Sequence, residues 1–210
     1  MNLIILGPQG SGKGTQARLV ADSLGLFYFE SGDFLRESAK VNPRIDEIVN
    51  KKGELLPDEE VFGLITKYFE EKHPTLEDFI LDGYPRSLKQ YEMLKNWLLG
   101  KGKKINWVIY LTLSEDESLT RITARRICEK CDRVWNLVTN PPPAPDTCEC
   151  GGRLIQRQDD TPEVVKKRLE IYQETTAPLI EVFKKDGILV SVNGEQPIDT
   201  ILKEIVAKVA

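Results

Sequence analysis

The clearest candidate for chemistry is the run Gly7-Pro8-Gln9-Gly10-Ser11-Gly12-Lys13-Gly14-Thr15, which has the residue spacing of a phosphate-binding loop. A short apolar segment precedes it and a helical pattern follows it. Glycines let backbone N–H groups converge on phosphate oxygens, and the N-terminus of the helix adds a favourable partial charge. Lys13 would reach the β- and γ-phosphates. The run therefore predicts a loop that binds a nucleoside triphosphate, with a plain glycine-rich turn as the weaker alternative.

One position of this loop narrows the class of protein. The residue after the lysine is Gly14, whereas GTPases and many ATPases have a Ser or Thr there that binds Mg²⁺. We therefore expect the magnesium ion to be held largely by nucleotide oxygens and water, which suits its reluctance to dehydrate. A signalling switch, which would hydrolyse the nucleotide slowly without an acceptor, is disfavoured but stays an alternative.

A second candidate for chemistry is a group of cysteines arranged as CxxC followed by CxC. The chain has four, namely Cys128, Cys131, Cys148 and Cys150. Four thiolates at this separation suit a tetrahedral structural Zn²⁺ site with no open position. In a chain without an export signal the cluster favours a metal over disulfides, with free or redox thiols and an iron-loaded site as alternatives. The zinc-ribbon spacing, with Trp135 nearby, also leaves a nucleic-acid-binding module open.

Composition restricts the class of protein further. The 210 residues are 30% charged and 40% hydrophobic, which is typical of globular proteins and suits one large domain with inserted lobes or two small domains. The net charge of -4 argues against a surface that coats nucleic acid. No apolar run approaches the length of a membrane span, and the segment from Met1 to Gly7 lacks the basic start of a signal peptide. We therefore expect a soluble, cytoplasmic protein that does not bind membranes.

The elements that must position these groups alternate between strand and helix. Helical periodicity predicts a helix over Lys13–Leu24. Short β-branched or aromatic runs predict strands at Leu3–Leu6, Phe79–Leu81, Ile105–Leu113 and Gly187–Val192. This alternation predicts an α/β fold with a parallel sheet covered on both faces. Two stretches interrupt it, because short helices are expected between Ser31 and Pro57 and no helix between Cys128 and Gly152.

Five motifs, in order and at characteristic spacing, resemble the adenylate kinase family over essentially the full length of the chain. They are Gly7–Thr15, Ser31–Arg36, Asp82–Arg86, Arg121 with Arg125 and Arg126, and Arg157–Asp160 followed by Arg168. The resemblance implies the fold of P-loop nucleoside monophosphate kinases, with a five-stranded parallel sheet flanked by helices. It also implies a core of residues 1–29, 57–123 and 161–210, an NMP-binding subdomain of residues 30–56 and a zinc-binding LID subdomain of residues 124–160.

The resemblance implies a reaction, the reversible transfer of the terminal phosphoryl group from Mg-ATP to AMP to give two molecules of ADP, in adenine nucleotide homeostasis and salvage. Such a transfer needs both polyanions aligned and their charge neutralised. Arginine suits this task because its guanidinium offers a bidentate fork that stays charged at any working pH. The implied catalytic residues are Lys13, Asp82, Arg86, Arg121, Arg125, Arg157, Asp159, Asp160 and Arg168.

Several of these residues have a simpler interpretation. Asp82 resembles the acid that holds a magnesium-bound water, but Asp-Gly is also a common turn pair. Asp159 and Asp160 would organise the closed lid through its arginines, or else cap the helix that begins near Thr161. Any single arginine could lie on the solvated surface. We expect His73 to be a surface residue and neither a metal ligand nor a base.

The resemblance implies separate contacts for the two nucleotides. ATP would contact Gly10, Ser11, Gly12, Lys13, Gly14, Thr15, Arg121, Arg125, Val134, Trp135 and Gln196. AMP would contact Ser31, Arg36, Glu54, Leu55, Leu56, Gly83, Tyr84, Pro85, Arg86, Gln90, Arg157 and Arg168. The amide of Gln90 would read the adenine edge of AMP, and the carbonyl of Gln196 would read that of ATP. Ser31 stands where threonine is more usual, which would loosen the base preference slightly.

The cysteine cluster resembles the zinc-bearing lids of bacterial adenylate kinases, whose second pair is usually CxxC rather than CxC. We therefore expect Mg²⁺ bound with ATP and a structural Zn²⁺ bound by Cys128, Cys131, Cys148 and Cys150. The expected partners are ATP, AMP and ADP, with no nucleic acid, and the family favours a monomer. A UMP or CMP kinase of the same fold is the nearest alternative, because it would differ only in the acceptor pocket.

Overall fold

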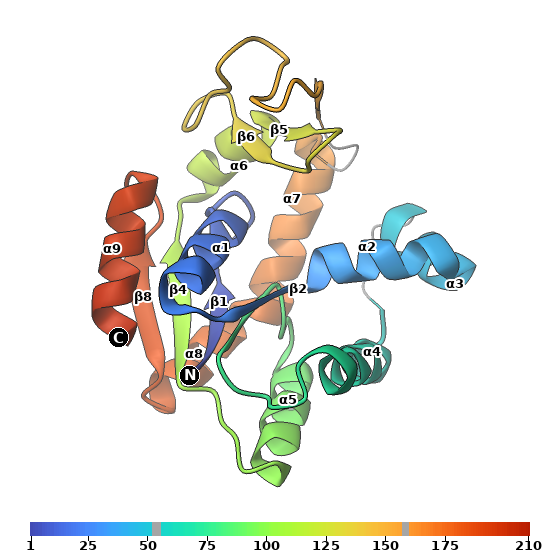
Figure 1. Cartoon of the computed structure of the whole chain (residues 1–210), viewed down its shortest axis with the longest axis vertical. Helices are drawn as coiled ribbons and strands as arrows, with labels where there is room; N and C mark the ends of the chain where they lie inside the picture. Colours follow the sequence, from blue (N-terminus) through green and yellow to red (C-terminus); the bar gives the residue numbers. More distant parts are fainter. Residues whose placement is uncertain (52–55, 157–159) are drawn as a thin grey trace.

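The centre of the protein is a five-stranded parallel sheet, seen in a computed structural model that describes residues 1–51, 56–156 and 160–210 (Figure 1). The strand order is β2-β3-β1-β4-β8. Ile4 of the central strand lies opposite Leu81 on one side and Val108 on the other. The strands are β1 (Asn2–Leu6), β2 (Phe27–Glu30), β3 (Phe79–Asp82), β4 (Trp107–Thr112) and β8 (Leu189–Asn193).

Helices cover both faces of the sheet because successive side chains of a strand point to opposite sides. Leu3 and Ile5 pack with one layer, and Ile4 and Leu6 pack with the other. None of these four side chains is more than 3% exposed. The first layer consists of α1 (Lys13–Leu24) and α9 (Ile198–Val209). The second consists of α4 (Asp58–Lys72), α5 (Leu88–Gly100) and α8 (Pro178–Lys185).

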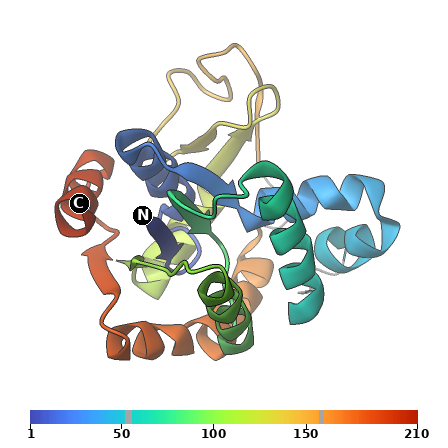
Figure 2. The same cartoon turned by 60° about the horizontal axis from the view of Figure 1, so that its bottom comes forward.

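Two further groups of elements project from this core (Figures 1 and 2). After β2 the chain forms α2 (Ser31–Val41), α3 (Pro43–Ile45) and the π-helical η1 (Asp46–Lys51). A small antiparallel sheet in the order β6-β5-β7 consists of β5 (Arg125–Cys128), β6 (Val134–Asn136) and β7 (Leu154–Ile155). The chain enters it from α6 (Glu115–Thr123) and later continues through α7 (Pro162–Ile171) and η2 (Tyr172–Thr176).

The predicted α/β class and its five-stranded parallel sheet are confirmed. The helix predicted over Lys13–Leu24 has those bounds, while β4 and β8 each begin two residues later than predicted, at Trp107 and Leu189. The short helices expected after Ser31 are α2, α3 and η1. The sequence pattern alone does not predict β2, because Phe27-Tyr28-Phe29-Glu30 is too short and too uniformly aromatic to show a strand period.

An aromatic cluster fastens β2 to α4. The ring of Phe69 lies 5.7 Å from that of Phe27, 5.2 Å from that of Phe29 and 5.3 Å from that of Phe79, measured between centroids. His73 differs from the expected surface residue, because it is half-buried and its ring stacks on Phe27 with centroids 4.5 Å apart. An imidazole at the end of a helix can present its flat face to an apolar neighbour while keeping its nitrogens near solvent.

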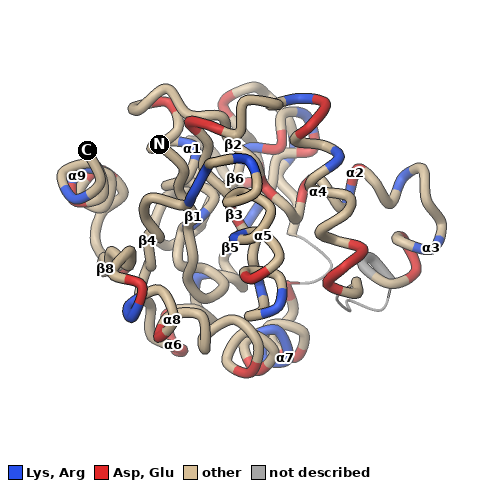
Figure 3. Tube along the Cα trace, turned by 90° about the horizontal axis from the view of Figure 1, so that it is seen from below, with Lys and Arg blue, Asp and Glu red and all other residues tan. Residues whose placement is uncertain are grey.

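Charged residues of both signs are interspersed around the outside of the molecule, as α7 and α9 illustrate (Figure 3). Such mixing is what an ordinary solvated surface requires and differs from the single-sign face of a protein that coats nucleic acid. Within the described residues, no helix is both long enough and apolar enough to cross a membrane.

Replacing Phe69, which is 1% exposed, by Ala should lower the free energy of unfolding by about 3–5 kcal/mol, because it leaves a cavity among the aromatic rings. Chemical denaturation measures the loss. Phe62→Ala on the same helix is the matched control, since Phe62 is only half-buried and should cost less. Equal losses in the two variants would contradict the role of the aromatic cluster.

Candidate active site

The lysine of the glycine-rich loop between β1 and α1 is hydrogen-bonded to the loop itself. Lys13 is the first residue of α1, and its Nζ donates hydrogen bonds to the carbonyl oxygens of Gly7 (2.7 Å) and Pro8 (2.8 Å). The Ser11 hydroxyl is buried and has no hydrogen-bond partner in the described part of the chain. An unpaired buried hydroxyl beside a glycine-rich turn and a helix N-terminus fits a phosphate oxygen.

The carboxylate of Asp82, at the end of β3, lies beside Gly14 in this loop. A Cβ atom on Gly14 would be only 3.3 Å from Asp82 Oδ2, so the carboxylate fills the space next to the position where other loops have Ser or Thr. Asp82 is 5% exposed, and burial raises its pKa while the charges of Lys13 and Arg86 oppose that rise. The loop and the strand end therefore form one site.

Arginines from three separate segments share the space around Lys13. Desolvation lowers the pKa of Lys13 to about 8; the charge of Asp82 opposes this fall, and those of Arg86, Arg168 and Arg125 add to it. Arg86 follows β3, Arg125 begins β5 and Arg168 lies on α7. The structure therefore brings together residues that the sequence separates by up to 155 positions, from Lys13 to Arg168.

A buried carboxylate holds the arginines of β5 and α7. Asp160 is 0% exposed, and it accepts a bidentate pair of hydrogen bonds from Arg125, with Nε at 2.8 Å from Oδ2. Arg168 Nη1 lies 4.0 Å from Asp160 Oδ1. The alternative that Asp160 caps α7 is wrong, because Thr161 is the N-cap and its side chain accepts from the backbone N–H of Val164.

Arg121, on α6, ties the turn after β8 to the phosphate loop. Its Nη1 donates to the carbonyl oxygen of Gly194 (2.7 Å), and its Nε pairs with Glu117 (2.7 Å). The side chain of Arg121 packs beside Gly10. Gln196 follows in the same turn, and its side chain donates to Asn193 O and to Glu204 Oε2. The predicted contact from the Gln196 backbone stays a prediction.

On the acceptor side, the carbonyl oxygen of Gly83 accepts hydrogen bonds from two residues of the predicted site. Ser31 Oγ and Arg86 Nε each donate to it at 2.7 Å. Gly83 has a φ of 75°, and a Cβ atom there would come within 2.8 Å of Ser31 Oγ, so only glycine fits. The side chain of Arg36 extends from α2 toward Glu30, with Nη2 at 3.4 Å from Oε1. Tyr84 and Pro85 complete this turn and are both buried.

Gln90, the predicted reader of adenine, is buried and already hydrogen-bonded. Its Oε1 accepts from the backbone N–H of Arg86 (2.7 Å), and its Nε2 donates to Asp58 Oδ1 (2.7 Å). Each of these amide atoms can form a second hydrogen bond. The contacts fix the orientation of the amide, so that Oε1 is assigned as the acceptor and Nε2 as the donor.

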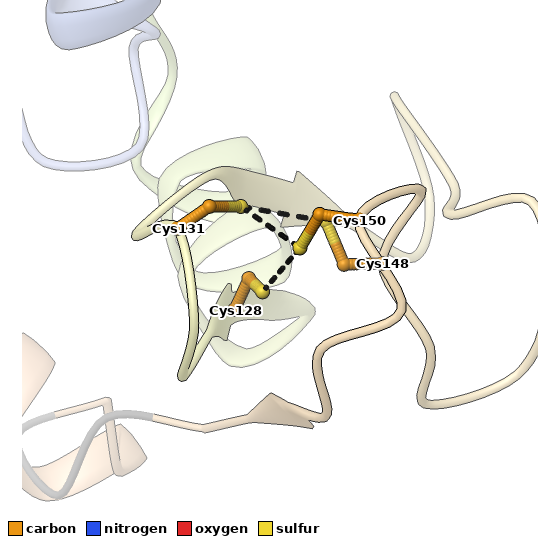
Figure 4. Close-up of side chains that lie close together, drawn as sticks. All are labelled: Cys128, Cys131, Cys148 and Cys150. Carbon is orange, nitrogen blue, oxygen red and sulfur yellow. Dashed lines mark hydrogen bonds between the residues drawn. The ribbon is translucent and has the colours of Figure 1, made fainter.

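The four cysteines converge at one point in the β5–β7 region (Figure 4). All four Sγ atoms lie within 4.8 Å of one another, with Cys131 3.3 Å from Cys150 and 3.7 Å from Cys148. Zn–S bonds of about 2.3 Å in a tetrahedron place neighbouring sulfur atoms about 3.8 Å apart, so the arrangement fits zinc. Gly152 leaves the necessary room, because a Cβ atom there would be 2.5 Å from Cys128 Sγ.

Comparisons with known proteins agree with this geometry. The family described as "Adenylate kinase" matches residues 5–188 of the chain. The adenylate kinase of Archaeoglobus fulgidus is 42% identical over 99% of this chain and 97% of its own length. Those of Thermosipho africanus and Pyrococcus furiosus are 39% and 42% identical, over 98% of this chain and 97% and 94% of their own lengths. The chain belongs to the adenylate kinase family. It is therefore a nucleoside monophosphate phosphotransferase.

Trp135 belongs to the small apolar cluster around the cysteines of this adenylate kinase. Trp135 is 5% exposed, and its indole Nε1 donates to Cys148 Sγ (3.3 Å). This hydrogen bond holds the indole against the cysteines, and the predicted contact of Trp135 with ATP stays a prediction. Val134, its neighbour on β6, is 44% exposed and faces away from that small core. The predicted contact of Val134 with ATP likewise stays a prediction.

Some predicted residues lie outside the described part of the chain. These are Glu54, Leu55, Arg157 and Asp159. Leu56 lies within the described part, and its side chain is buried, with 3% exposed. The prediction that its backbone contacts AMP stays a prediction. Gly12 and Thr15 are exposed at the start of α1, as a loop open to a ligand requires.

The sequence analysis missed two acidic residues of the site. Asp58 fixes Gln90, but its place after Pro57 at a helix start resembles an ordinary turn. Glu30 ends β2 and pairs with Arg36. Burial raises the pKa of Glu30 to about 7, with smaller contributions from a hydrogen bond to Asp33 and from the charge of Asp82. The sequence feature that could have identified Glu30 is its position directly before the Ser31–Arg36 motif. It was missed because it ends β2, the strand that the pattern did not predict.

The lowered pKa of Lys13 predicts that ATP binding takes up a proton. Before ATP binds, about half of the Lys13 side chains are charged near pH 8, and phosphate oxygens favour the charged form. Binding at pH 8 should therefore take up about half a proton per ATP. The affinity for ATP should weaken as the pH rises further. At pH 7 the lysine is already mostly charged, so the uptake should fall. Calorimetry in buffers of different ionisation enthalpy measures it, and Lys13→Met should abolish it. An uptake that survives in the variant would assign the proton to another group.

Proposed function

We propose that this adenylate kinase transfers the terminal phosphoryl group of Mg-ATP reversibly to AMP, giving ADP from both, and so serves adenine nucleotide homeostasis and salvage. The observation that carries the proposal is the gathering of a phosphate loop, a buried carboxylate and three arginines around Lys13. Transfer between two polyanions needs this kind of alignment and charge neutralisation more than it needs covalent chemistry from the protein.

On the donor side we assign the phosphates of ATP to the loop from Gly10 to Thr15. The Ser11 hydroxyl, which has no hydrogen-bond partner among the described residues, supports this, as does Lys13, whose two contacts with loop carbonyls a phosphate group would replace. Arg121 holds the turn after β8 beside Gly10, which supports a contact between the Gln196 backbone and the adenine of ATP.

On the acceptor side we assign the phosphate of AMP to Arg36 and Arg86, and its base to Gln90 and Ser31. Arg86 and Ser31 both bond to the Gly83 carbonyl, which supports a rigid acceptor wall. Gln90 keeps a free position on each amide atom, as reading an adenine edge requires.

The transferring phosphoryl group would be stabilised by the lid-side arginines. Arg125 and Arg168 face Asp160, and a phosphoryl group carries more charge than a carboxylate and can compete for them. Asp82 would orient a water bound to the magnesium ion. Arg157 and Asp159 complete the proposed set on the strength of the sequence motif alone.

We propose that the chain divides into the three parts that the family resemblance implies. The core consists of residues 1–29, 57–123 and 161–210, the NMP-binding part of residues 30–56, and the LID of residues 124–160. The separate sheet β6-β5-β7 supports the third part, as does its own small core of Cys128, Trp135, Cys148 and Leu154. Closure of such a lid would exclude water and limit hydrolysis of ATP.

Two metals belong to the proposal. Mg²⁺, bound with ATP, would neutralise phosphate charge, and Asp82 would orient its water shell. Zn²⁺ would be held by Cys128, Cys131, Cys148 and Cys150 in a purely structural role, because four protein ligands leave no open position. A lid with so small an apolar core needs such a source of folding free energy.

The proposal includes a monomer that acts in the cytoplasm, which rests on the family resemblance. The alternatives of a UMP or CMP kinase and of a zinc-ribbon nucleic-acid-binding module are not favoured by the relatives named above, which are described as adenylate kinases. The mixed surface charge also speaks against the second alternative.

Lys13→Met should reduce the conversion of ATP and AMP to ADP by about 100-fold or more, because it removes a charge that stabilises the transferring group. A coupled assay measures the rate, and circular dichroism checks that the variant is folded. Unchanged activity in a folded variant would refute the loop assignment. The same assay with UMP, CMP and GMP should give lower rates than with AMP, and a preference for another acceptor would refute the choice of substrate.

Removing the metal with a chelator should lower the melting temperature by at least about 5 °C, since 1 kcal/mol corresponds to about 2–4 °C for a chain of this size. Elemental analysis should find about one zinc per chain before treatment. Cys148→Ser is the control, because the chelator should have little further effect on a site that is already incomplete. A metal-free chain with an unchanged melting temperature would contradict the structural role of the metal, and a chain without zinc before treatment would contradict the site itself.

A further inference from the structure

The carboxylate of Glu30 bridges two arginines at the edge of the acceptor site. Its Oε1 accepts a hydrogen bond from Arg36 Nη2 (3.4 Å). Its Oε2 accepts from Arg18 Nη2 (3.3 Å) and from the Tyr28 hydroxyl (2.9 Å). The side chain is 22% exposed. Glu30 lies directly opposite Asp82 in the register of β2 and β3, so it faces the place where the two nucleotides would meet.

Charged or titratable groups face Glu30 from every element packed around it. They are Arg18 on α1, Tyr28 on β2, Asp33 and Arg36 on α2, Asp82 at the end of β3, and Arg86 in the turn that follows it. Arg36 pairs with Glu30 and also with Asp33, which lies three residues earlier on the same helix. Two carboxylates therefore neutralise the arginine that we assign to the acceptor phosphate.

A carboxylate and a phosphate offer the same kind of oxygen to a guanidinium group, so they compete for it. If Arg36 turns to a phosphate, Glu30 still keeps Arg18 and Tyr28 as partners and does not become an unpaired buried charge. Asp33 still holds Arg36 from within α2. The exchange is therefore possible without rearranging the strand, but a phosphate arriving beside Glu30 meets a like charge.

We propose that Glu30 is a positioning residue that holds Arg36 in the empty acceptor site and gives it up to the phosphate of the incoming nucleotide, so that its negative charge weakens acceptor binding. The proposal rests on the assignment of Arg36 to the AMP phosphate made above. Glu30 itself touches neither nucleotide in this account, and its effect reaches the substrate through Arg36 and through charge repulsion.

The test is Glu30→Gln, which keeps the shape of the side chain and its bonds to Arg18 and Tyr28 but removes the charge. At pH 8.5, where a carboxyl group with a pKa of about 7 is mostly ionised, the Kd for AMP by calorimetry and the KM for AMP should both fall about three- to fivefold, the range expected for a charge interaction at a partly exposed site. The KM for ATP should not change, because the loop at Lys13 is untouched. The gain should shrink at high salt, which screens the repulsion. A merely structural defect would not tighten binding of one substrate.

Two variants serve as controls. Glu37→Gln removes an exposed carboxylate from the same helix, where it pairs only with the surface residue Lys40 in the described contacts, and should leave both KM values unchanged. Glu30→Asp keeps the charge and should bind AMP as the wild type does. If Glu30→Gln does not fold, Glu30→Ser gives the same comparison.

The outcomes separate this inference from the proposed function. A folded Glu30→Gln variant that binds AMP as the wild type does, or more weakly, would overturn the role of Glu30 while leaving the acceptor assignment intact. A wild-type chain that fails to bind AMP and to phosphorylate it would overturn both. Tighter binding of AMP in Glu30→Gln but not in Glu37→Gln or Glu30→Asp would support the inference.

Discussion

The active site of this protein holds several positively charged side chains close together, and their mutual repulsion is the constraint on the rest of the structure. Lys13, Arg86, Arg125 and Arg168 all act on one space, and like charges in a desolvated site repel each other. The structure places an acceptor beside each group: loop carbonyls for Lys13, the Gly83 carbonyl for Arg86 and the buried carboxylate of Asp160 for Arg125. In the proposed function, substrate binding exchanges these internal partners for phosphate oxygens, and we expect that exchange to set how tightly each nucleotide binds.

The parallel sheet makes this concentration of charge possible. Parallel strands present their carboxyl ends at one edge, so the phosphate loop after β1, Glu30 at the end of β2 and Asp82 at the end of β3 meet there although they are far apart in sequence. The apolar strands provide the rigidity, because residues such as Ile4 and Ile80 are fully buried between two layers of helices. The β5–β7 region adds Arg125 from outside the sheet, and a metal at its cysteines would make that region rigid where its apolar core is small.

Much of this arrangement could be predicted from the sequence, because spacing and residue type carry it. The loop before α1, the strand ending at Asp82 and the convergence of four cysteines needed only local patterns and general rules of coordination. The internal partners could not be predicted in this way. The pairing of Arg125 with Asp160, the bonds of Gln90 to Asp58, and the indole of Trp135 turned toward Cys148 all depend on how distant segments pack. Glu30 was missed for a related reason, since its strand is too short and too aromatic to show a period.

The most direct measurement of the central claim is a crystal structure with a bisubstrate compound in which five phosphates link two adenosines. The account predicts that Lys13 Nζ leaves the carbonyls of Gly7 and Pro8 and that the guanidinium groups of Arg36, Arg86 and Arg125 contact phosphate oxygens. A complex in which the phosphates lie away from the loop, with Lys13 still bonded to its two carbonyls and Arg125 engaged only by Asp160, would contradict it.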